Sequence, residues 1–209
     1  MYISNAILYG VFAMVSWFSP SLVSILGPRL CMMVAGVPYV LYIISILLFI
    51  NTVSIYVATI LLGLGASVLW TAQGTFLSNN SDVRTVTRNF GVFWAMNTSS
   101  TFIGNLFAYY QFKDRELIDK STRMTLGYAF ITISGVGICL MYFLRPTPWV
   151  KQQMRDRRMV TTFTDTIKLF LTRDMLMFSF TLFYTGLHQS LWGGVYTTSI
   201  GLTKGFFRS

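Results

Sequence analysis

The chain has 209 residues, of which 54% are hydrophobic, 16% aromatic and only 11% charged. Water-soluble domains carry about a quarter charged residues, so this composition excludes an ordinary soluble enzyme or binding module and predicts an integral membrane protein. The net charge of +9 does not indicate a nucleic-acid partner, because the basic residues fall between apolar stretches, where membrane topology explains them.

Six apolar stretches are long enough to cross a bilayer, since a span needs about 20 mainly apolar residues for about 30 Å of hydrocarbon. Lipid offers no partner for backbone N–H and C=O groups, so each stretch is expected to be a continuous helix. The predicted fold is therefore an all-α, polytopic transmembrane helix bundle surrounded by the lipid bilayer. The six stretches are 3–26, 30–50, 54–78, 90–111, 125–144 and 175–202.

The first two stretches contain Pro20 and Pro38, kinks that neighbouring helices can accommodate. No basic segment and no small-residue cleavage site precede the first stretch, so a removable signal peptide is not expected. Short cytoplasmic loops collect Lys and Arg. Placing the loop at 27–29 in the cytoplasm puts ten basic residues inside and six outside, and both termini then lie outside the cytoplasm.

The segment 145–174 is the long connection of the chain, and it opens with R-P-T-P-W. Later in it, Val160, Phe163, Ile167 and Phe170 recur at helical spacing. This pattern favours a short amphipathic helix lying in the headgroup region. The alternative is a solvated connector whose periodicity is accidental.

Two of the predicted helices carry polar stripes, because residues three and four apart share one face. In the fourth span Asn97, Thr101 and Asn105 follow one another at successive turns. Side chains of this kind are expected to face inward, either as hydrogen-bonding glue between helices or as the lining of a water-filled path or substrate cavity. In the third span the stripe is Gly63, Ala66, Ser67, Trp70, Gln73 and Gly74.

The single histidine, His188, lies within the sixth span, flanked one turn away by Tyr184 and Trp192. An ionisable group inside a membrane helix indicates a functional site, for example for proton coupling. The alternative is a neutral imidazole hydrogen-bonded to a neighbouring helix. Cys31 and Cys139 both fall in apolar stretches and are expected to serve packing.

No nucleophile–base pair, phosphate loop or metal-ligand cluster stands out in the sequence, so no catalytic residue, cofactor, metal or enzyme activity is expected. The candidate cavity or helix-contact residues are Trp70, Gln73, Asn97, Thr101, Asn105 and His188.

Five segments carry a family resemblance. The most specific is L-W-T-A-Q-G-T-F-L-S-N-N-S at 69–81, followed after a short loop by R-N-F-G-V-F-W-A at 88–95. Supporting segments are I-L-Y-G-V-F-A at 7–13, G-P-R-L at 27–30 and Y-T-G-L…G-V-Y at 184–196. With them the sequence resembles the Unc-ninety-three-like family, a branch of the major facilitator superfamily, and most resembles its metazoan eleven-type members.

This resemblance implies a partial major facilitator fold holding about helices 2–7 of 12, and hence a truncated chain. Residues 1–144 would be five transmembrane helices of the N-terminal half without its first helix. Residues 145–174 would be a cytoplasmic linker with the amphipathic helix, and 175–209 the truncated first helix of the C-terminal half. At the position of the superfamily's charged loop signature only Gly27, Pro28 and Arg29 remain.

Two functions are open at this point. The first is a non-enzymatic multi-pass membrane protein that regulates or escorts a membrane partner such as a potassium channel, as the resemblance implies. The alternative is a facilitator-type solute transporter with the polar stripe facing inward and His188 in the pathway. Facilitator folds bind their substrate between two halves, and this chain holds most of one half.

Overall fold

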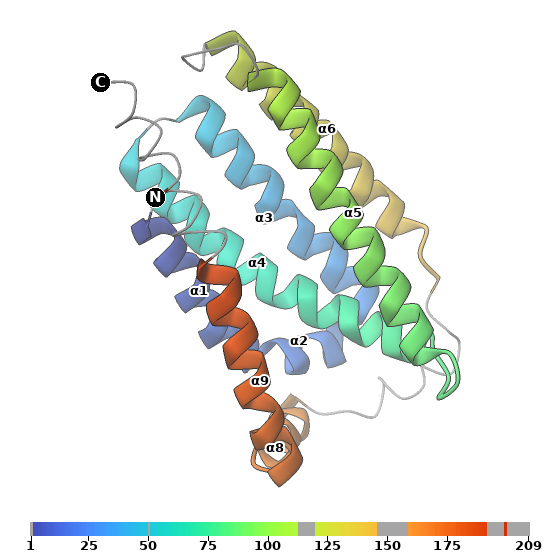
Figure 1. Ribbon diagram of the computed structural model, residues 1–209. Helices are drawn as coiled ribbons and strands as arrows, with labels where there is room; N and C mark the ends of the chain where they lie inside the picture. The colour runs from blue at the N-terminus through green and yellow to red at the C-terminus, as the bar shows by residue number, and fades with distance from the viewer. Residues whose placement is uncertain (1, 50, 113–119, 146–158, 192–198, 200–209) are drawn as a thin grey trace. The chain divides into compact units, whose positions relative to one another are not determined.

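The computed structural model describes residues 2–49, 51–112, 120–145, 159–191 and 199. All regular structure in these ranges is helical, which confirms the all-α class (Figure 1). The chain divides into two units, Ile3–Phe163 and Thr164–Ser209. The helices are α1 (Tyr2–Ser16), α2 (Ser19–Leu26), α3 (Pro28–Leu48), α4 (Thr52–Asn79), α5 (Val86–Phe112), α6 (Lys120–Tyr142), α8 (Met159–Phe170) and α9 (Arg173–Ser190).

Within the described residues, three helices are long and apolar enough to cross a membrane: α3, α4 and α6 from Ser121 onward. A fourth span results if the bent pair α1–α2 counts as one. The helix α5 has 27 residues, which is sufficient length, but its run of amides and hydroxyls makes it more polar than these. Of the predicted sixth span, 175–202, the structure describes residues 175–191 and 199.

The predicted first span, 3–26, is not one straight rod. It breaks after Ser16, and the segments Ile3–Ser16 and Ser19–Leu26 meet at 61°. The cause is Pro20, which has no N–H for the Ser16 carbonyl and whose ring would clash with that carbonyl in a continuous helix. Pro20 instead lies in the first turn of α2, where a backbone N–H would have no partner within the helix, so its absence costs no hydrogen bond.

A glycine joins α2 to α3. Gly27 has φ 87° and ψ 146°, a region of backbone space that is essentially open only to glycine. Its N–H donates to the Val23 carbonyl at 3.0 Å, which closes α2. Pro28 follows as the first residue of α3, the helix position that proline suits best. The chain can therefore reverse here with a single linking residue.

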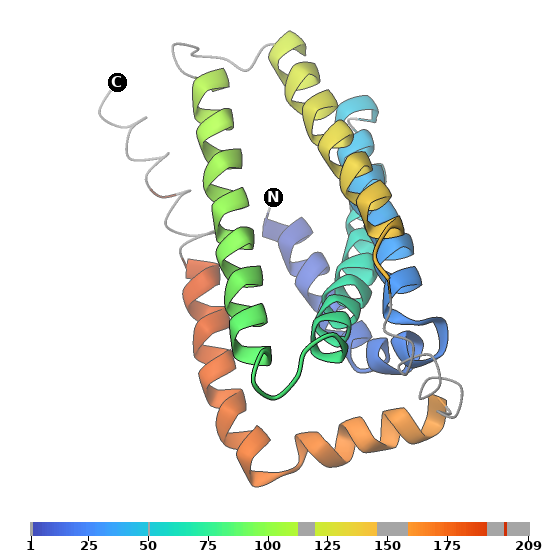
Figure 2. The same ribbon diagram turned by 90° about the vertical axis from the view of Figure 1, so that its right-hand side faces the viewer.

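The helix α3 lies between α4 and α6, and glycines let the three approach closely (Figures 1 and 2). A Cβ added at Gly65 of α4 would lie 2.8 Å from the Ala35 carbonyl oxygen and 2.8 Å from Pro38 Cγ. A Cβ at Gly36 would lie 2.9 Å from Ile138 on α6. The contact continues where Gly127 of α6 meets the Leu47 side chain, so α3 and α6 run antiparallel.

The opposite side of α4 meets α1 and the break that follows it. A Cβ at Gly63 would lie 3.0 Å from the Leu8 carbonyl oxygen. One turn later the fully buried Ser67 hydroxyl hydrogen-bonds with Ser19 at 2.7 Å and with Ser16 at 3.1 Å. These contacts confirm that the small residues of the α4 stripe allow close helix packing, and they tie both sides of the α1–α2 break to one side chain.

An apolar core forms where α2, α3 and α4 meet. Its buried members are Val23, Cys31, Met32 and Ala72. Cys31 therefore packs as expected. Cys139 does not, because it is exposed on α6, one position past Ile138 and off the face that meets α3.

Arg29 fastens the end of α6 to the start of α3. Its guanidinium donates to the Tyr142 carbonyl and also lies 4.9 Å from the centre of the Tyr142 ring. The last carbonyls of a helix have no partner within it, and a cation at that end is favoured by the helix dipole. The residue left in place of a charged loop signature thus has a structural role as a helix cap.

The predicted amphipathic segment is helical, as α8. Its charged residues Asp165 and Lys168 are exposed, whereas Ile167 is half-buried. Within the first unit, the Phe163 ring stacks on Phe18 with centroids 5.4 Å apart and an interplanar angle of 8°. The helix is confirmed, and its position in the headgroup region stays a prediction.

Candidate functional site

A chain of aromatic contacts joins α3, α4 and α5. The Trp70 ring of α4 stacks on Trp94 of α5, with centroids 6.0 Å apart and planes 19° apart. Phe93 meets the same Trp70 ring edge-on at 6.4 Å. Trp70 also hydrogen-bonds with the Tyr39 side chain, and because an indole has only a donor, its N–H donates to the phenol oxygen. Even so, Trp70 is 40% and Trp94 51% exposed.

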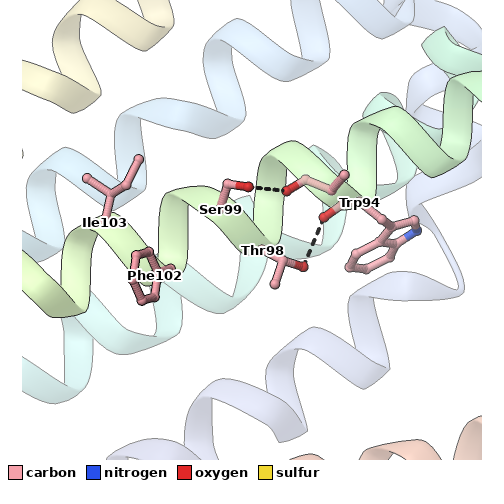
Figure 3. A pocket seen from close by; sticks show the side chains of 6 residues that line it. Trp94, Thr98, Ser99, Phe102 and Ile103 are labelled. Carbon is pink, nitrogen blue, oxygen red and sulfur yellow. Dashed lines mark hydrogen bonds between the residues drawn. The ribbon is translucent and has the colours of Figure 1, made fainter.

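A run of hydroxyls, T-S-S-T at 98–101, follows Trp94 on α5. Thr98 donates to the Trp94 carbonyl at 2.9 Å and Ser99 to the Ala95 carbonyl at 2.8 Å, as Figure 3 shows. Ser and Thr in helices commonly bond back to the preceding turn in this way. Since each hydroxyl has one proton, these oxygens present only lone pairs to their surroundings.

Beside this run lies an open hollow of about 760 Å³ on α5. Figure 3 shows that its labelled side chains all come from this one helix, with Trp94, Thr98 and Phe102 in one row and Ser99 and Ile103 in the next. The lining residues are Trp94, Ala95, Thr98, Ser99, Phe102 and Ile103. The hollow is therefore aromatic and hydroxylated, and none of its lining side chains carries a charge.

The predicted polar stripe on α5, formed by Asn97, Thr101 and Asn105, is only partly buried by the other helices of the first unit. Asn97 is half-buried, whereas Thr101 and Asn105 are exposed. Thr101 donates to the Asn97 carbonyl at 3.2 Å. The helix meets α4 and α6 only sparsely, so the expected inward orientation does not take the form of burial against the described helices. That this polar stripe lines a water-filled path or substrate cavity stays a prediction.

On α4, Trp70 is the member of the predicted stripe that reaches α5. Gln73, nearly one turn later, is half-buried. A Cβ added at Gly74 would meet nothing within 4 Å. The stripe is therefore used in two ways: its first half packs against α1 and α2, and its second half turns toward α5 or open space.

His188 belongs to α9, in the second unit. Its ring stacks on Tyr184 with centroids 6.3 Å apart and planes 17° apart, and both residues are exposed. Trp192, the other expected neighbour, lies outside the described residues. The structure thus confirms the aromatic flank on one side, and a role for His188 in a pathway stays a prediction.

Several residues of this site escaped the sequence-based prediction. Tyr39 was not expected to hold Trp70, and Ser99, Phe102 and Ile103 lie off the predicted stripe. The signal that points to them is the T-S-S-T run, because four consecutive hydroxyls within a membrane helix cannot all lie on one face. Among the described residues, no three His, Cys, Asp or Glu side chains gather as a metal site would require.

Comparisons with known proteins agree over nearly the whole chain. The sequence profile of the family described as "Ion channel regulatory protein UNC-93" matches residues 1–208. The chain is 35% identical to the UNC93-like protein MFSD11 of Xenopus tropicalis, over 98% of this chain and 50% of that relative. It is 26% identical to the UNC93-like protein C922.05c of Schizosaccharomyces pombe, over 71% and 30% respectively.

The MFSD11 protein of Xenopus laevis gives a similar result, with 35% identity over 96% of this chain and 49% of the relative. The chain thus spans about half the length of the curated MFSD11 relatives it matches. No solved structure matches it.

Proposed function

The chain belongs to the UNC-93 family of ion channel regulatory proteins, and from this membership we propose that it acts without catalysis, by regulating or escorting a membrane partner such as a potassium channel. Regulation of this kind works through lateral contact between membrane helices. It needs a helix face that the protein does not cover with its own helices. The proposal therefore depends on finding such a face.

The exposed polar face of α5 is the observation that supports the proposal. Thr101 and Asn105 are exposed on a helix flanked by apolar spans. Thr101 donates to the Asn97 carbonyl, but lipid cannot hydrogen-bond the Asn105 amide, so this face is expected to meet another protein helix or water. Hydrogen bonds between membrane helices contribute about 0.6 kcal/mol on average and up to about 1.7 kcal/mol.

A coexpression experiment tests this proposal. Potassium current is recorded with the wild-type protein, with the double variant T101V/N105L, and with T132V as the matched control. Thr132 is an exposed α6 hydroxyl that donates to the Tyr128 carbonyl. We expect the wild type to change the current, the double variant to need about eightfold more protein for the same change, and T132V to behave as wild type. A current that the wild type leaves unchanged contradicts the proposal.

A second candidate function is facilitator-type solute transport, which the open hollow beside Trp94 favours. In this case the α5 face borders water rather than a partner. Flux of solutes into liposomes containing the intact protein tests it, with Asn97, Thr101 and His188 each changed to Ala. Loss of flux supports a pathway along these residues, and unchanged flux in all three variants counts against it.

A further inference from the structure

We propose that the α5 hollow, defined by its six lining residues, binds a small organic cation of the quaternary ammonium class. The ring faces of Trp94 and Phe102 and the hydroxyl oxygens of Thr98 and Ser99 would hold it. This inference deepens the second candidate function and rests on this face of α5 being open to water.

The sign of the ligand's charge follows from the hydroxyl protons. Thr98 and Ser99 donate theirs to backbone carbonyls at 2.9 and 2.8 Å, so both oxygens present lone pairs to the hollow. The other side chains that line it are Ala, Ile and aromatic residues, which offer an anion little besides the indole N–H. A cation or a hydrogen-bond donor matches this surface.

The faces of the aromatic rings, like the hydroxyl oxygens, present negative potential to the hollow. The face of an aromatic ring is its negative side, and a cation within about 6 Å of a Trp face is attracted more strongly than over Tyr or Phe. Trp94 is held by its stack on Trp70 at 6.0 Å, and Trp70 is in turn held by its hydrogen bond with Tyr39. The Trp94 ring is therefore held on one side before a ligand binds, which lowers the ordering cost of binding at this ring.

The composition of the hollow favours an alkylated cation over a metal ion. Hard cations such as Ca²⁺ take about six to eight oxygen ligands, and here two side-chain hydroxyls contribute. The hollow is open and lined by one helix, so a ligand would lie against a single wall of rings and hydroxyls. Quaternary ammonium groups, with methyl groups around the charge, are the ligands that aromatic walls recognise most typically.

Binding of radiolabelled choline to the intact protein in lipid nanodiscs tests the proposal. We expect saturable binding that 3,3-dimethylbutan-1-ol, the uncharged isostere of choline, displaces at least about tenfold less well than unlabelled choline. No saturable binding, or equal displacement by the isostere, overturns the proposal. The proposal is also overturned if the cysteine introduced by S99C does not react with a water-soluble thiol reagent, because a helix or lipid then covers this face of α5.

Variants locate the site. W94A is expected to weaken choline binding about tenfold and W94F much less, because Phe keeps a ring face. T98V keeps the shape and removes the oxygen, and should weaken binding about threefold. The matched controls on α6 are T132V and Y128A, which also alter an exposed back-bonded hydroxyl and an exposed ring. Equal effects in the controls, or none in the α5 variants, overturn the assignment.

Folding and transport are separated from binding by two further measurements. Helicity and monodispersity report whether W94A folds. If it does not fold, the proposal is tested by comparing choline binding in T98V with that in T132V and by comparing displacement by choline with displacement by its isostere. Liposome uptake is measured in parallel. Choline binding without uptake of any solute supports the site and counts against transport, whereas uptake of another solute without choline binding overturns the ligand class and leaves transport standing.

Discussion

Replacing Gly65 by alanine tests the close approach of α3 and α4. The new Cβ would lie 2.8 Å from both the Ala35 carbonyl oxygen and Pro38 Cγ, whereas ordinary contacts begin near 3.4 Å. A helix carbonyl and a closed proline ring cannot move aside, so the two helices must separate by about half an ångström. Overpacking of this kind costs about 1–3 kcal/mol. Alanine also favours the helix by about 1 kcal/mol over glycine.

The matched control is G74A, in the same helix, where the added methyl meets nothing within 4 Å. The helix-propensity gain is common to both variants, so their difference isolates the steric cost. Unfolding in mixed micelles, followed as loss of helicity during SDS titration, gives the free energy of unfolding. We expect G74A to be at least as stable as wild type and G65A to be about 1–3 kcal/mol less stable than G74A. Equal stability of the two variants would refute the contact through Pro38.

Two further changes address the polar contacts of the first unit. R29A removes the donor to the Tyr142 carbonyl, so amide hydrogen exchange in the last turn of α6 should accelerate about tenfold, with R29K intermediate; unchanged exchange would show that this end needs no cap. S67A removes a fully buried hydroxyl that hydrogen-bonds with both serines flanking the α1–α2 break. It should lower the free energy of unfolding by about 1–3 kcal/mol. The control T132A, on the exposed face of α6, should change the free energy of unfolding by less than about 0.5 kcal/mol. A loss no larger than that of T132A would mean that the break is held by other contacts.

Helix positions were predictable because each depends on a local pattern. The stretches 30–50 and 54–78 correspond to α3 and α4 within a few residues. The spacing of Val160 and Phe170 correctly predicted α8. The α4 stripe predicted close packing, and Gly63 and Ser67 confirm it.

Contacts between distant segments could not be read from one sequence. Arg29 looked like a residual loop charge, yet it caps a helix 113 residues later in the chain. Periodicity placed Asn97, Thr101 and Asn105 on one side of α5 but could not say which side other helices cover. The direction of the hydroxyl protons at Thr98 and Ser99, on which the ligand class depends, likewise requires coordinates.

The corner between α1 and α2 shortens the first predicted span along the axis of α1. A straight helix over residues 3–26 would measure about 36 Å, longer than the roughly 30 Å of hydrocarbon. Bent by 61°, the pair reaches only about 27 Å along the axis of α1. Hydrophobic mismatch is commonly relieved by tilting or kinking a helix. With α1 upright, the short arm α2 would run obliquely just beneath the headgroups, and its buried serines Ser19 and Ser21 would stay packed inside the bundle rather than meet water.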